Sequence, residues 1–341
     1  MKFLFLGGGA IGTYVGGSLA AAGDEVTFIE RPETAAVIAE HGLKVHTADT
    51  TRVVRDVTVH GSAAEALAHG PYDIGVFALK SFDTQTALDE LVATGYEVPT
   101  ILSLQNGVDN EPAIAATLGA DKVIAGTVAT AVSKPGVGEV VEEKHRGIGV
   151  ALGHPLAQPL VEALDRAGLS GKAFDDAPSM KWSKLLTNLT GNATSAILDE
   201  TVAELFADKR SYTIEVAVLA ECLAVMKAKG YRVVDLPGTP VRALAWATKL
   251  PRFIAQPALT KALGAGRGDK MPSFHIDLHG GRGRTEVSFL NGAVARGGEQ
   301  AGVPTPVNAL LTDTLEALSA GELPLDAYRH DPDALLARLA R

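Results

Sequence analysis

The glycine run near the start of the chain constrains its fold more than any other feature. Gly7-Gly8-Gly9-Ala10-Ile11-Gly12 fits the pattern G-x-G-x-x-G, follows the apolar segment Phe3–Leu6 and opens the helical stretch Ile11–Ala22. A strand, a glycine turn and a helix in this order predict a site where backbone and helix N-terminus meet a dinucleotide pyrophosphate. A glycine-rich turn that binds nothing is the weaker interpretation, because the context is the one the pattern needs.

Apolar segments recur through the first half of the chain. Glu25–Glu30, Tyr72–Leu79, Thr100–Leu104 and Lys122–Thr127 have the composition of buried strands, and helical segments separate them. This alternation predicts a doubly wound, mostly parallel sheet, the α/β Rossmann class. From about residue 179 onward long helical patterns dominate, which predicts an all-α C-terminal domain. We place the domains at residues 1–175 and 176–341.

Three helical stretches are expected in the second half. They are Thr201–Lys229, Pro306–Ala320, and a shorter one from Thr239 to Leu250 in which Thr239 is the N-cap and Pro251 the stop. The segment Leu250–Lys270 is rich in proline, glycine and basic residues. It is expected to be a loop or a short helix, with no assigned role.

Composition excludes several classes of partner and cofactor. The net charge is −9 and the basic residues are dispersed, which favours neither nucleic acid nor an anionic membrane. The chain has no signal peptide pattern and no apolar stretch long enough to span a bilayer, so a cytoplasmic location is expected. With the single cysteine Cys222, and with no HExxH-type spacing expected among the nine histidines, no metal is expected. A homodimer is one option for the long helices.

Two residues of opposite charge follow the second predicted strand. A carboxylate about 20 residues beyond the glycines typically holds the ribose 2′-hydroxyl of NAD, whereas an arginine accepts the 2′-phosphate of NADP. Glu30 and Arg31 stand side by side at this place. The residues themselves therefore leave NAD(H), NADP(H) and a solvated surface pair open.

Polar residues follow two more strands, at the edge where open α/β sheets bind ligands. Lys80 ends the run YDIGVFALK, and Asn106-Gly107 follows TILSLQ. Lys80 can meet a cofactor phosphate or ribose, and the Asn106 amide can bridge nicotinamide and substrate because it both donates and accepts. The alternatives are a surface lysine and a plain turn dipeptide.

A polar stripe is predicted on one helix of the second half. Lys184, Asn188 and Asn192 recur at every fourth position of KWSKLLTNLTGNATSA, which covers an arc of about 80° on a helix. In a cleft, a lysine ammonium can stabilise the charge that hydride delivery creates on a carbonyl oxygen and then donate its proton. The asparagines can hold hydroxyl or carboxylate groups, and a solvated helix face is the alternative.

A densely polar segment lies between the later helical stretches, and two of its residues stand out. Ser273 is either a helix N-cap or a substrate contact. Glu286 either pairs with Arg282 or Arg284, or orients Lys184 or bonds the substrate or the nicotinamide ribose.

The order of these motifs resembles that of the ketopantoate reductase (2-dehydropantoate 2-reductase) family. GGGAIG, FALKSFDT, LQNGVDNE, WSKLLTNLTGN, KMPSF and GRTEVSFLNG follow one another across nearly the whole chain. Members of that family reduce 2-dehydropantoate to pantoate with NADPH, in the pathway to pantothenate and coenzyme A. The resemblance therefore implies a small 2-keto acid substrate and favours NADP(H), with NAD(H) the alternative because of Glu30.

The resemblance also implies roles for single residues. Lys184 is the proton donor, and Asn106 and Glu286 lie where cofactor and substrate meet, so Lys184 and Glu286 are the catalytic pair. The cofactor positions are Gly7, Gly8, Gly9, Ala10, Ile11, Gly12, Arg31, Lys80, Asn106 and Glu286. The substrate positions are Asn106, Lys184, Asn188, Asn192 and Ser273.

The chain departs from the family pattern beside the expected substrate. Phe274-His275-Ile276-Asp277 stands where the family often has M-L-x-D, and Val287-Ser288 replaces I-D. We expect the reaction type to be retained and ketopantoate to be the best single substrate. Another 2-oxo acid or a bulkier ketone is the second interpretation, and a nucleotide-sensing protein without catalysis is the third.

Overall fold

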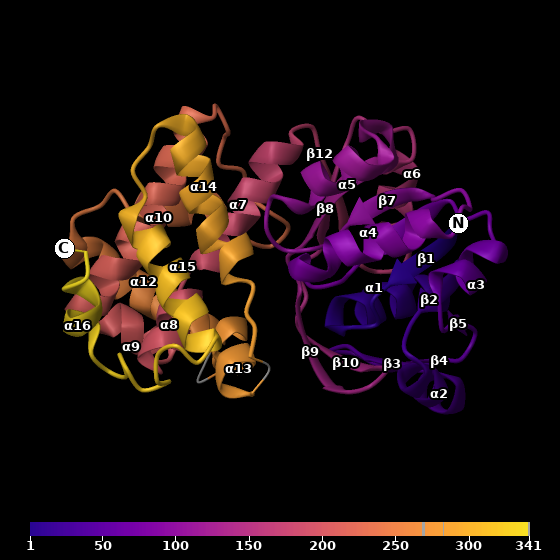
Figure 1. Cartoon of the computed structure of the whole chain (residues 1–341), viewed down its shortest axis with the longest axis horizontal. Coiled ribbons are helices and arrows are strands. Elements are labelled where there is room, and N and C mark those ends of the chain that lie inside the picture. Colours follow the sequence, from indigo (N-terminus) through magenta and orange to yellow (C-terminus); the bar gives the residue numbers. More distant parts are fainter. Residues whose placement is uncertain (268–269, 282, 340–341) are drawn as a thin grey trace. The chain divides into compact units, whose positions relative to one another are not determined.

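The computed structural model describes residues 1–267, 270–281 and 283–339, which form two compact units (Figure 1). The first consists of Met1–Lys181 with Leu236–Thr239, and the second of Trp182–Asp235 with Pro240–Arg341. An α/β unit with a mostly parallel sheet and a helical unit confirm the predicted fold class. The division falls inside helix α7 (Ala177–Leu189), and the domain boundary after residue 175 stays a prediction.

Within the described residues, the main sheet has eight strands in the order β12-β11-β8-β7-β6-β1-β2-β5. β8 and β11 pair antiparallel, and the other neighbours are parallel. Along β1, Phe3 and Phe5 join one hydrophobic cluster and Leu4 and Leu6 another. Both faces of the sheet are therefore covered, which explains the continuous apolar runs. The strands are β1 (Lys2–Leu6), β2 (Glu25–Ile29), β5 (Thr58–His60), β6 (Ile74–Phe77), β7 (Thr100–Ser103), β8 (Val123–Val128), β11 (Ile148–Ala151) and β12 (Gly171–Phe174).

A second sheet in the same unit, of four strands over the described residues, was not predicted. Its order is β4-β3-β10-β9, and its strands are β3 (Leu43–His46), β4 (Thr51–Val54), β9 (Ala131–Gly136) and β10 (Glu139–Lys144). Leu43, Val45, Val54 and Val140 are its buried residues in the cluster that contains Phe3 and Phe5. Tyr14 of helix α1 (Ala10–Ala21) donates to Glu142 of β10. Burial and this carboxylate raise the pKa of the Tyr14 hydroxyl, so it keeps its proton and the bond.

Short helices link the strands of the first unit. Helix α1 follows β1 and packs on both β2 and the second sheet. The others are α2 (Pro32–His41), α3 (Ala63–Ala68), η1 (Ser81–Asp83), α4 (Thr84–Ala93), α5 (Asn110–Leu118), η2 (Ala120–Lys122) and α6 (Ala157–Arg166).

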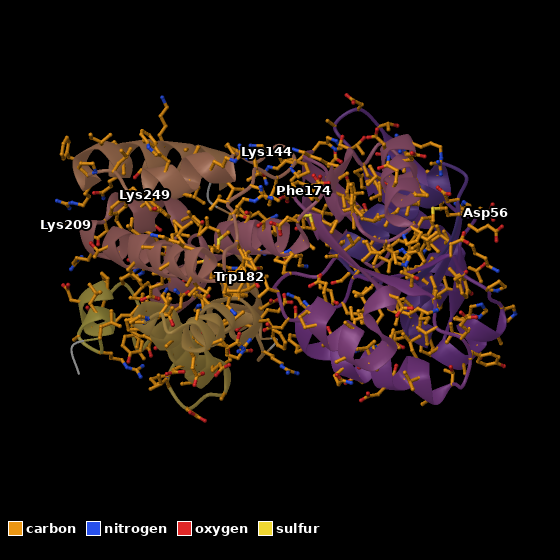
Figure 2. All side chains as sticks on the ribbon, turned by 90° about the horizontal axis from the view of Figure 1, so that it is seen from above. Asp56, Lys144, Phe174, Trp182, Lys209 and Lys249 are labelled. Carbon is orange, nitrogen blue, oxygen red and sulfur yellow. The ribbon has the colours of Figure 1, made fainter. Side chains whose placement is uncertain are left out.

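The second unit is built from helices in its described part (Figure 1). Its first residue, Trp182 of α7, is labelled in Figure 2 and packs on Tyr231 with ring centroids 5.9 Å apart. None of the described helices has the length and apolarity to cross a membrane. The helices after α7 are α8 (Asn192–Leu198), α9 (Val202–Ala207), α10 (Lys209–Ala228), α11 (Val241–Ala247), α12 (Arg252–Arg267), α13 (Ser273–His279), η3 (Val287–Phe289), α14 (Asn291–Ala301), α15 (Pro306–Ser319) and α16 (Pro332–Leu336).

Two predicted helices of this unit were wrong in detail. The stretch 201–229 is two helices, because Asp208 is extended (φ −74°, ψ 134°) and its carboxylate accepts from the backbone N–H groups of Arg210 and Ser211 at 2.8 and 3.0 Å. This N-cap starts a new helix where the apolar pattern continues without a break. The shorter helix begins at Val241 with Pro240, not Thr239, at its N-cap.

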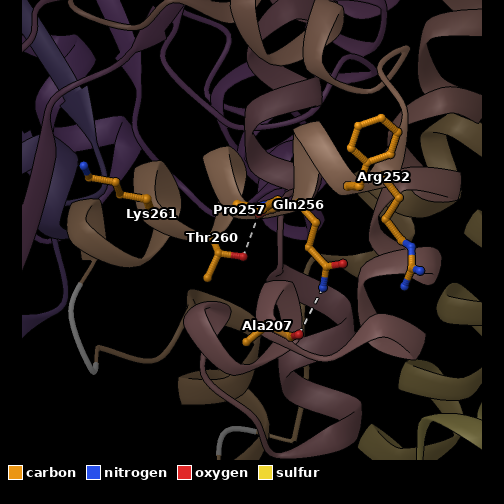
Figure 3. Close-up of a pocket in the computed structure, with 7 residues that line it drawn as sticks. Ala207, Arg252, Gln256, Pro257, Thr260 and Lys261 are labelled. Carbon is orange, nitrogen blue, oxygen red and sulfur yellow. Dashed lines mark hydrogen bonds between the residues drawn. The ribbon is translucent and has the colours of Figure 1, made fainter.

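The segment predicted as a loop or short helix is α12, which continues through the internal Pro257. Hydrogen bonds hold it to the end of α9. Gln256 Nε2 donates to Ala207 O at 3.0 Å (Figure 3) and to Phe206 O at 3.0 Å, and Thr260 Oγ1 donates to Phe206 O at 2.9 Å. These bonds satisfy carbonyl groups at the end of α9 that lack partners within that helix. Residues 268–269 of the segment lie outside the described part of the chain.

Candidate functional site

The glycine turn joins β1 to α1 at the carboxyl end of the main sheet. β1 lies between β2 on one side and β6 on the other, so the strand order reverses at this position. Open α/β sheets bind ligands at such a point. A Cβ on Gly12 would lie 1.8 Å from Gly7 O, whereas a Cβ on Gly9 would have no neighbour closer than Ala78 O at 3.9 Å. Gly12 is therefore needed for the packing of the protein itself, and Gly9 leaves open space above the turn.

The N-terminus of α1 points into this open space. Gly9 is the N-cap and provides no side-chain hydrogen bond, so the first-turn amides keep their capacity to donate. An anion is the natural acceptor for such amides, because the helix dipole adds partial positive charge. The turn thus fits a dinucleotide pyrophosphate by its shape and its donors.

Three charged residues surround the turn. The Glu30 carboxylate accepts from Gly8 N, and its second oxygen accepts from Arg31 N at 3.3 Å. Lys134 of β9 donates from Nζ to Gly8 O at 2.8 Å. Arg31 is exposed at the N-cap of α2, so the surroundings hold two cations and one carboxylate.

Sequence reasoning missed Lys134, and no local pattern marks it. It lies 126 positions after Gly8, on a strand of the sheet that was not predicted. Only the pairing of β9 with β10, and the packing of α1 on that sheet, bring it to the turn.

The structure brings the two predicted strand-end residues, Lys80 and Asn106, into neighbouring segments. Their strands β6 and β7 are parallel neighbours, and Ser81 Oγ donates to Asn106 O at 2.9 Å. The preceding residues Ala78 and Leu79 lie against Gly7, within 3.3 Å of where its Cβ would stand. Lys80 is half-buried and Asn106 exposed, and both follow strands that end at the same edge of the sheet as β1, which leads into the glycine turn.

Three residues of the second unit were predicted to form a polar stripe on a single helix. The prediction is wrong for one of them, which lies on a different helix. Lys184 and Asn188 lie one turn apart on α7 and are half-buried. Gly191 then adopts φ +65°, its N–H donates to buried Glu215 Oε2 at 2.6 Å, and Asn192 begins the separate helix α8. The left-handed glycine ends α7 where the polar period predicted continuity.

Asn192 and Ser273 are nevertheless brought together. Asn192 Oδ1 accepts from Phe274 N at 3.1 Å and lies 3.4 Å from Ser273 Oγ. Pro272, not Ser273, is the N-cap of α13, so the capping prediction for Ser273 is wrong and the Asn192 amide supplies the first-turn acceptor. Asn192 is 6% exposed, which contradicts a solvated face at this residue.

Glu286 lies at the N-cap of the short helix η3 and is buried together with Thr285. A carboxylate removed from water needs hydrogen-bonding or charged partners. One of the two arginines weighed as its partner, Arg282, lies outside the described residues. The polar character continues into α14, where Asn291 Nδ2 donates to Asn308 Oδ1 at 3.1 Å.

A buried lysine that the sequence patterns did not indicate holds the start of α7. Lys181 Nζ donates to Gln105 O at 2.8 Å and Gly126 O at 3.2 Å, and lies 2.7 Å from Glu111 Oε1. These partners follow β7 or lie within β8, at the edge that carries Asn106. Lys184 stands one helical turn further along the same helix.

We expect Lys181→Ala to lower the free energy of unfolding by about 3–5 kcal/mol, because it leaves the Glu111 carboxylate without its buried partner. Urea denaturation of the two proteins measures this difference. The control is Lys122→Ala, whose partner Glu97 is 89% exposed, and which should cost no more than about 1 kcal/mol. Equal effects of the two substitutions would contradict the role given to Lys181.

Comparison with known proteins decides the family. A family model described as "Ketopantoate reductase PanE/ApbA" matches residues 3–152, and one described as "Ketopantoate reductase PanE/ApbA C terminal" matches residues 176–319. The chain belongs to the ketopantoate reductase family. The family inferred from the order of the motifs is thereby confirmed.

Individual members of the ketopantoate reductase family match over almost their full length. A 2-dehydropantoate 2-reductase from Pyrococcus horikoshii is 27% identical over 326 residues, which is 93% of this chain and 97% of that one. One from Archaeoglobus fulgidus is 27% identical over 320 residues, with the same coverage. The crystal structure of a PanE/ApbA family ketopantoate reductase from Ralstonia eutropha JMP134 has a TM-score of 0.80 at 27% identity, covering 94% of this chain and 99% of that one.

Proposed function

We propose that this protein is an NADPH-dependent reductase that converts 2-dehydropantoate to pantoate. The observation that carries the proposal is the open glycine turn, with free space over Gly9, uncapped amides on α1 and a cationic rim. It occurs in a chain whose named relatives are 2-dehydropantoate 2-reductases and support an oxidoreductase.

The residues of the second unit then act on the substrate. When bound, the nicotinamide would supply the hydride for the keto carbon. The carbonyl bond pair moves to oxygen, and Lys184 donates the proton that completes the alcohol. Asn188, Asn192 and Ser273 hold the hydroxyl and carboxylate groups of the substrate, and Asn106 and Glu286 orient the reacting groups.

The charges around the turn support NADPH over NADH. Glu30 alone would repel a 2′-phosphate, but its oxygens accept from Gly8 N and Arg31 N, which spreads its charge. Arg31, next to Glu30 in the chain, and Lys134, which donates to Gly8 O, add two positive charges. The net charge of these three side chains is positive, which favours the cofactor with the additional phosphate.

Arg31→Ala is expected to weaken NADPH binding by about tenfold or more, the usual worth of a hydrogen bond to a charged group. NADH binding should change far less, since NADH has no 2′-phosphate. Fluorescence titration with each cofactor measures both constants. Equal losses for NADPH and NADH would place the guanidinium away from the 2′-phosphate.

The substrate is tested by following NADPH absorbance with ketopantoate, 2-oxoisovalerate and phenylglyoxylate. We expect the highest kcat/KM with ketopantoate. The second candidate, another 2-oxo acid or a bulkier ketone, rests on the departure from the family pattern at Phe274–Ile276, directly after Ser273. No NADPH loss above background at millimolar ketopantoate would reject the first candidate, and turnover of phenylglyoxylate would then support the second.

A further inference from the structure

Three side chains of metal-binding type converge where α8 and α13 pack together in the second unit. Asp199, His275 and His279 each offer one ligand atom, and these atoms lie within 4.8 Å of one another. Over residues 1–267, 270–281 and 283–339, this is the one group of at least three such residues with this geometry. None of the three takes part in the chemistry proposed above.

The local fold presents the three groups to one another. His275 and His279 are one turn apart on α13, and their rings stack with centroids 4.2 Å apart. Asp199 is the C-cap of α8 in the left-handed conformation (φ +55°), which aspartate adopts more readily than most residues. At the other end of α13, Asn192 holds Phe274 N, so both ends of this short helix are bonded to the same segment.

The distances suit a small cation. His275 Nε2 lies 2.7 Å from Asp199 Oδ1, and a ring nitrogen of His279, Nε2, lies 3.1 Å from Ala196 O. Two ligands with metal bonds of about 2.1 Å stand about 3.4 Å apart on a tetrahedral ion. The ligand atoms lie 2.7 Å apart for the pair His275 and Asp199 and within 4.8 Å of one another for all three residues, so their separations span that value.

A fourth side chain binds the carboxylate oxygen of Asp199 that is not the proposed metal ligand. Arg329 donates to Asp199 Oδ2 at 2.8 Å and leaves Oδ1 toward the histidines. Ligating carboxylates are usually fixed by such an outer hydrogen bond.

We propose that Asp199, His275 and His279 bind a divalent transition metal of the zinc type, with water in a fourth position. Imidazole nitrogens with one carboxylate oxygen match Zn²⁺, whereas Mg²⁺ and Ca²⁺ take oxygen ligands throughout. The bound ion ties α13 to the end of α8. It thereby fixes the segment in which Ser273 lies 3.4 Å from Asn192.

The expectation that the chain binds no metal overlooked this pair of histidines. HIDLH at residues 275–279 has the spacing of HExxH without its glutamate. The third ligand lies 76 positions before His275, so no sequence motif could reveal it. His275 falls in the segment that departs from the family pattern after Ser273, and His279 lies two residues beyond it.

The test is a titration of chelator-treated full-length protein with Zn²⁺, followed by calorimetry. We expect one Zn²⁺ per chain and an increase in Tm, because the ion binds the folded state. His279→Gln should weaken binding by more than about 100-fold, since even outer-sphere partners of a metal are worth about 10–100-fold. His279 is exposed and glutamine can still donate to Ala196 O, so this variant should keep its fold.

Two further variants complete the test. Asp199→Asn should also lose most of the affinity. The matched control is His69→Gln, because His69 is another exposed histidine stacked on a neighbour, His60, with centroids 4.7 Å apart. That control should bind Zn²⁺ as the unmodified protein does. Absence of binding at micromolar Zn²⁺, or unchanged binding by both His279→Gln and Asp199→Asn, would overturn the proposal.

Discussion

Replacing Lys184 by alanine is expected to lower kcat by about 10² or more, the usual contribution of a positioned general acid. The half-buried ammonium on α7 is the proton source in the proposed reaction, and alanine has none. The Kd for NADPH should change little, because Lys184 belongs to the second unit and the glycine turn to the first. Steady-state assays with ketopantoate give kcat, and fluorescence titration gives Kd.

The matched control for this substitution is Lys209→Ala, an exposed lysine at the start of α10 that is labelled in Figure 2. It removes the same side chain and charge from the same unit and should leave kcat unchanged. Circular dichroism verifies that both variants are folded. A folded Lys184→Ala protein with the original kcat would remove this residue from the mechanism.

A single methyl group at Gly9 is expected to weaken cofactor binding by about 5- to 150-fold, which corresponds to an overpacking cost of about 1–3 kcal/mol. Gly9 has φ −67°, which alanine adopts, and its Cβ would have no protein atom closer than 3.9 Å. The free protein should therefore keep its stability within about 0.5 kcal/mol. In the proposed complex the added methyl group would contact the pyrophosphate and not the protein.

Gly12→Ala is the contrasting variant, because its Cβ would lie 1.8 Å from Gly7 O. The backbone of the turn has to move, so this substitution should destabilise the free protein by at least the overpacking cost of about 1–3 kcal/mol. Thermal unfolding without cofactor separates the two variants. If Gly9→Ala binds NADPH as tightly as the unmodified protein, the pyrophosphate does not lie over this turn.

The sequence predicted the elements that are buried on both faces. β1 and β6 are apolar at nearly every position, and all four residues of β7 are buried around Ile101 and Leu102, so a short window contains their signal. The second sheet escaped prediction because strands such as β3 alternate buried and half-buried residues over only four positions. A pattern this short does not distinguish a strand from a polar loop.

Helix ends in the second unit were harder to predict, because caps depend on single residues within a continuous pattern. Asp208 divides one apolar period into two helices by accepting two backbone hydrogen bonds. Gly191 ends α7 because it adopts a left-handed conformation and its N–H finds the buried Glu215. Hydrophobic periodicity contains no information about either event.

Some residues of the candidate site could likewise be predicted from the sequence, and others could not. Gly7–Gly12, Lys80 and Asn106 could be named from local context, since each follows a strand at the same edge of one sheet. Lys134 and Lys181 could not, because they meet their partners only through packing across distant parts of the chain. Their functions are set by tertiary structure, not by a motif.

The most direct test of the proposed reaction is the transfer of deuterium from NADPH labelled at both C4 positions to ketopantoate. Mass spectrometry of the product is predicted to show pantoate with one deuteron on the carbon that was the ketone, formed by the unmodified protein and at a strongly reduced rate by Lys184→Ala. Pantoate without the label, or no pantoate at all under these conditions, would contradict the assignment of this chain as a ketopantoate-reducing enzyme.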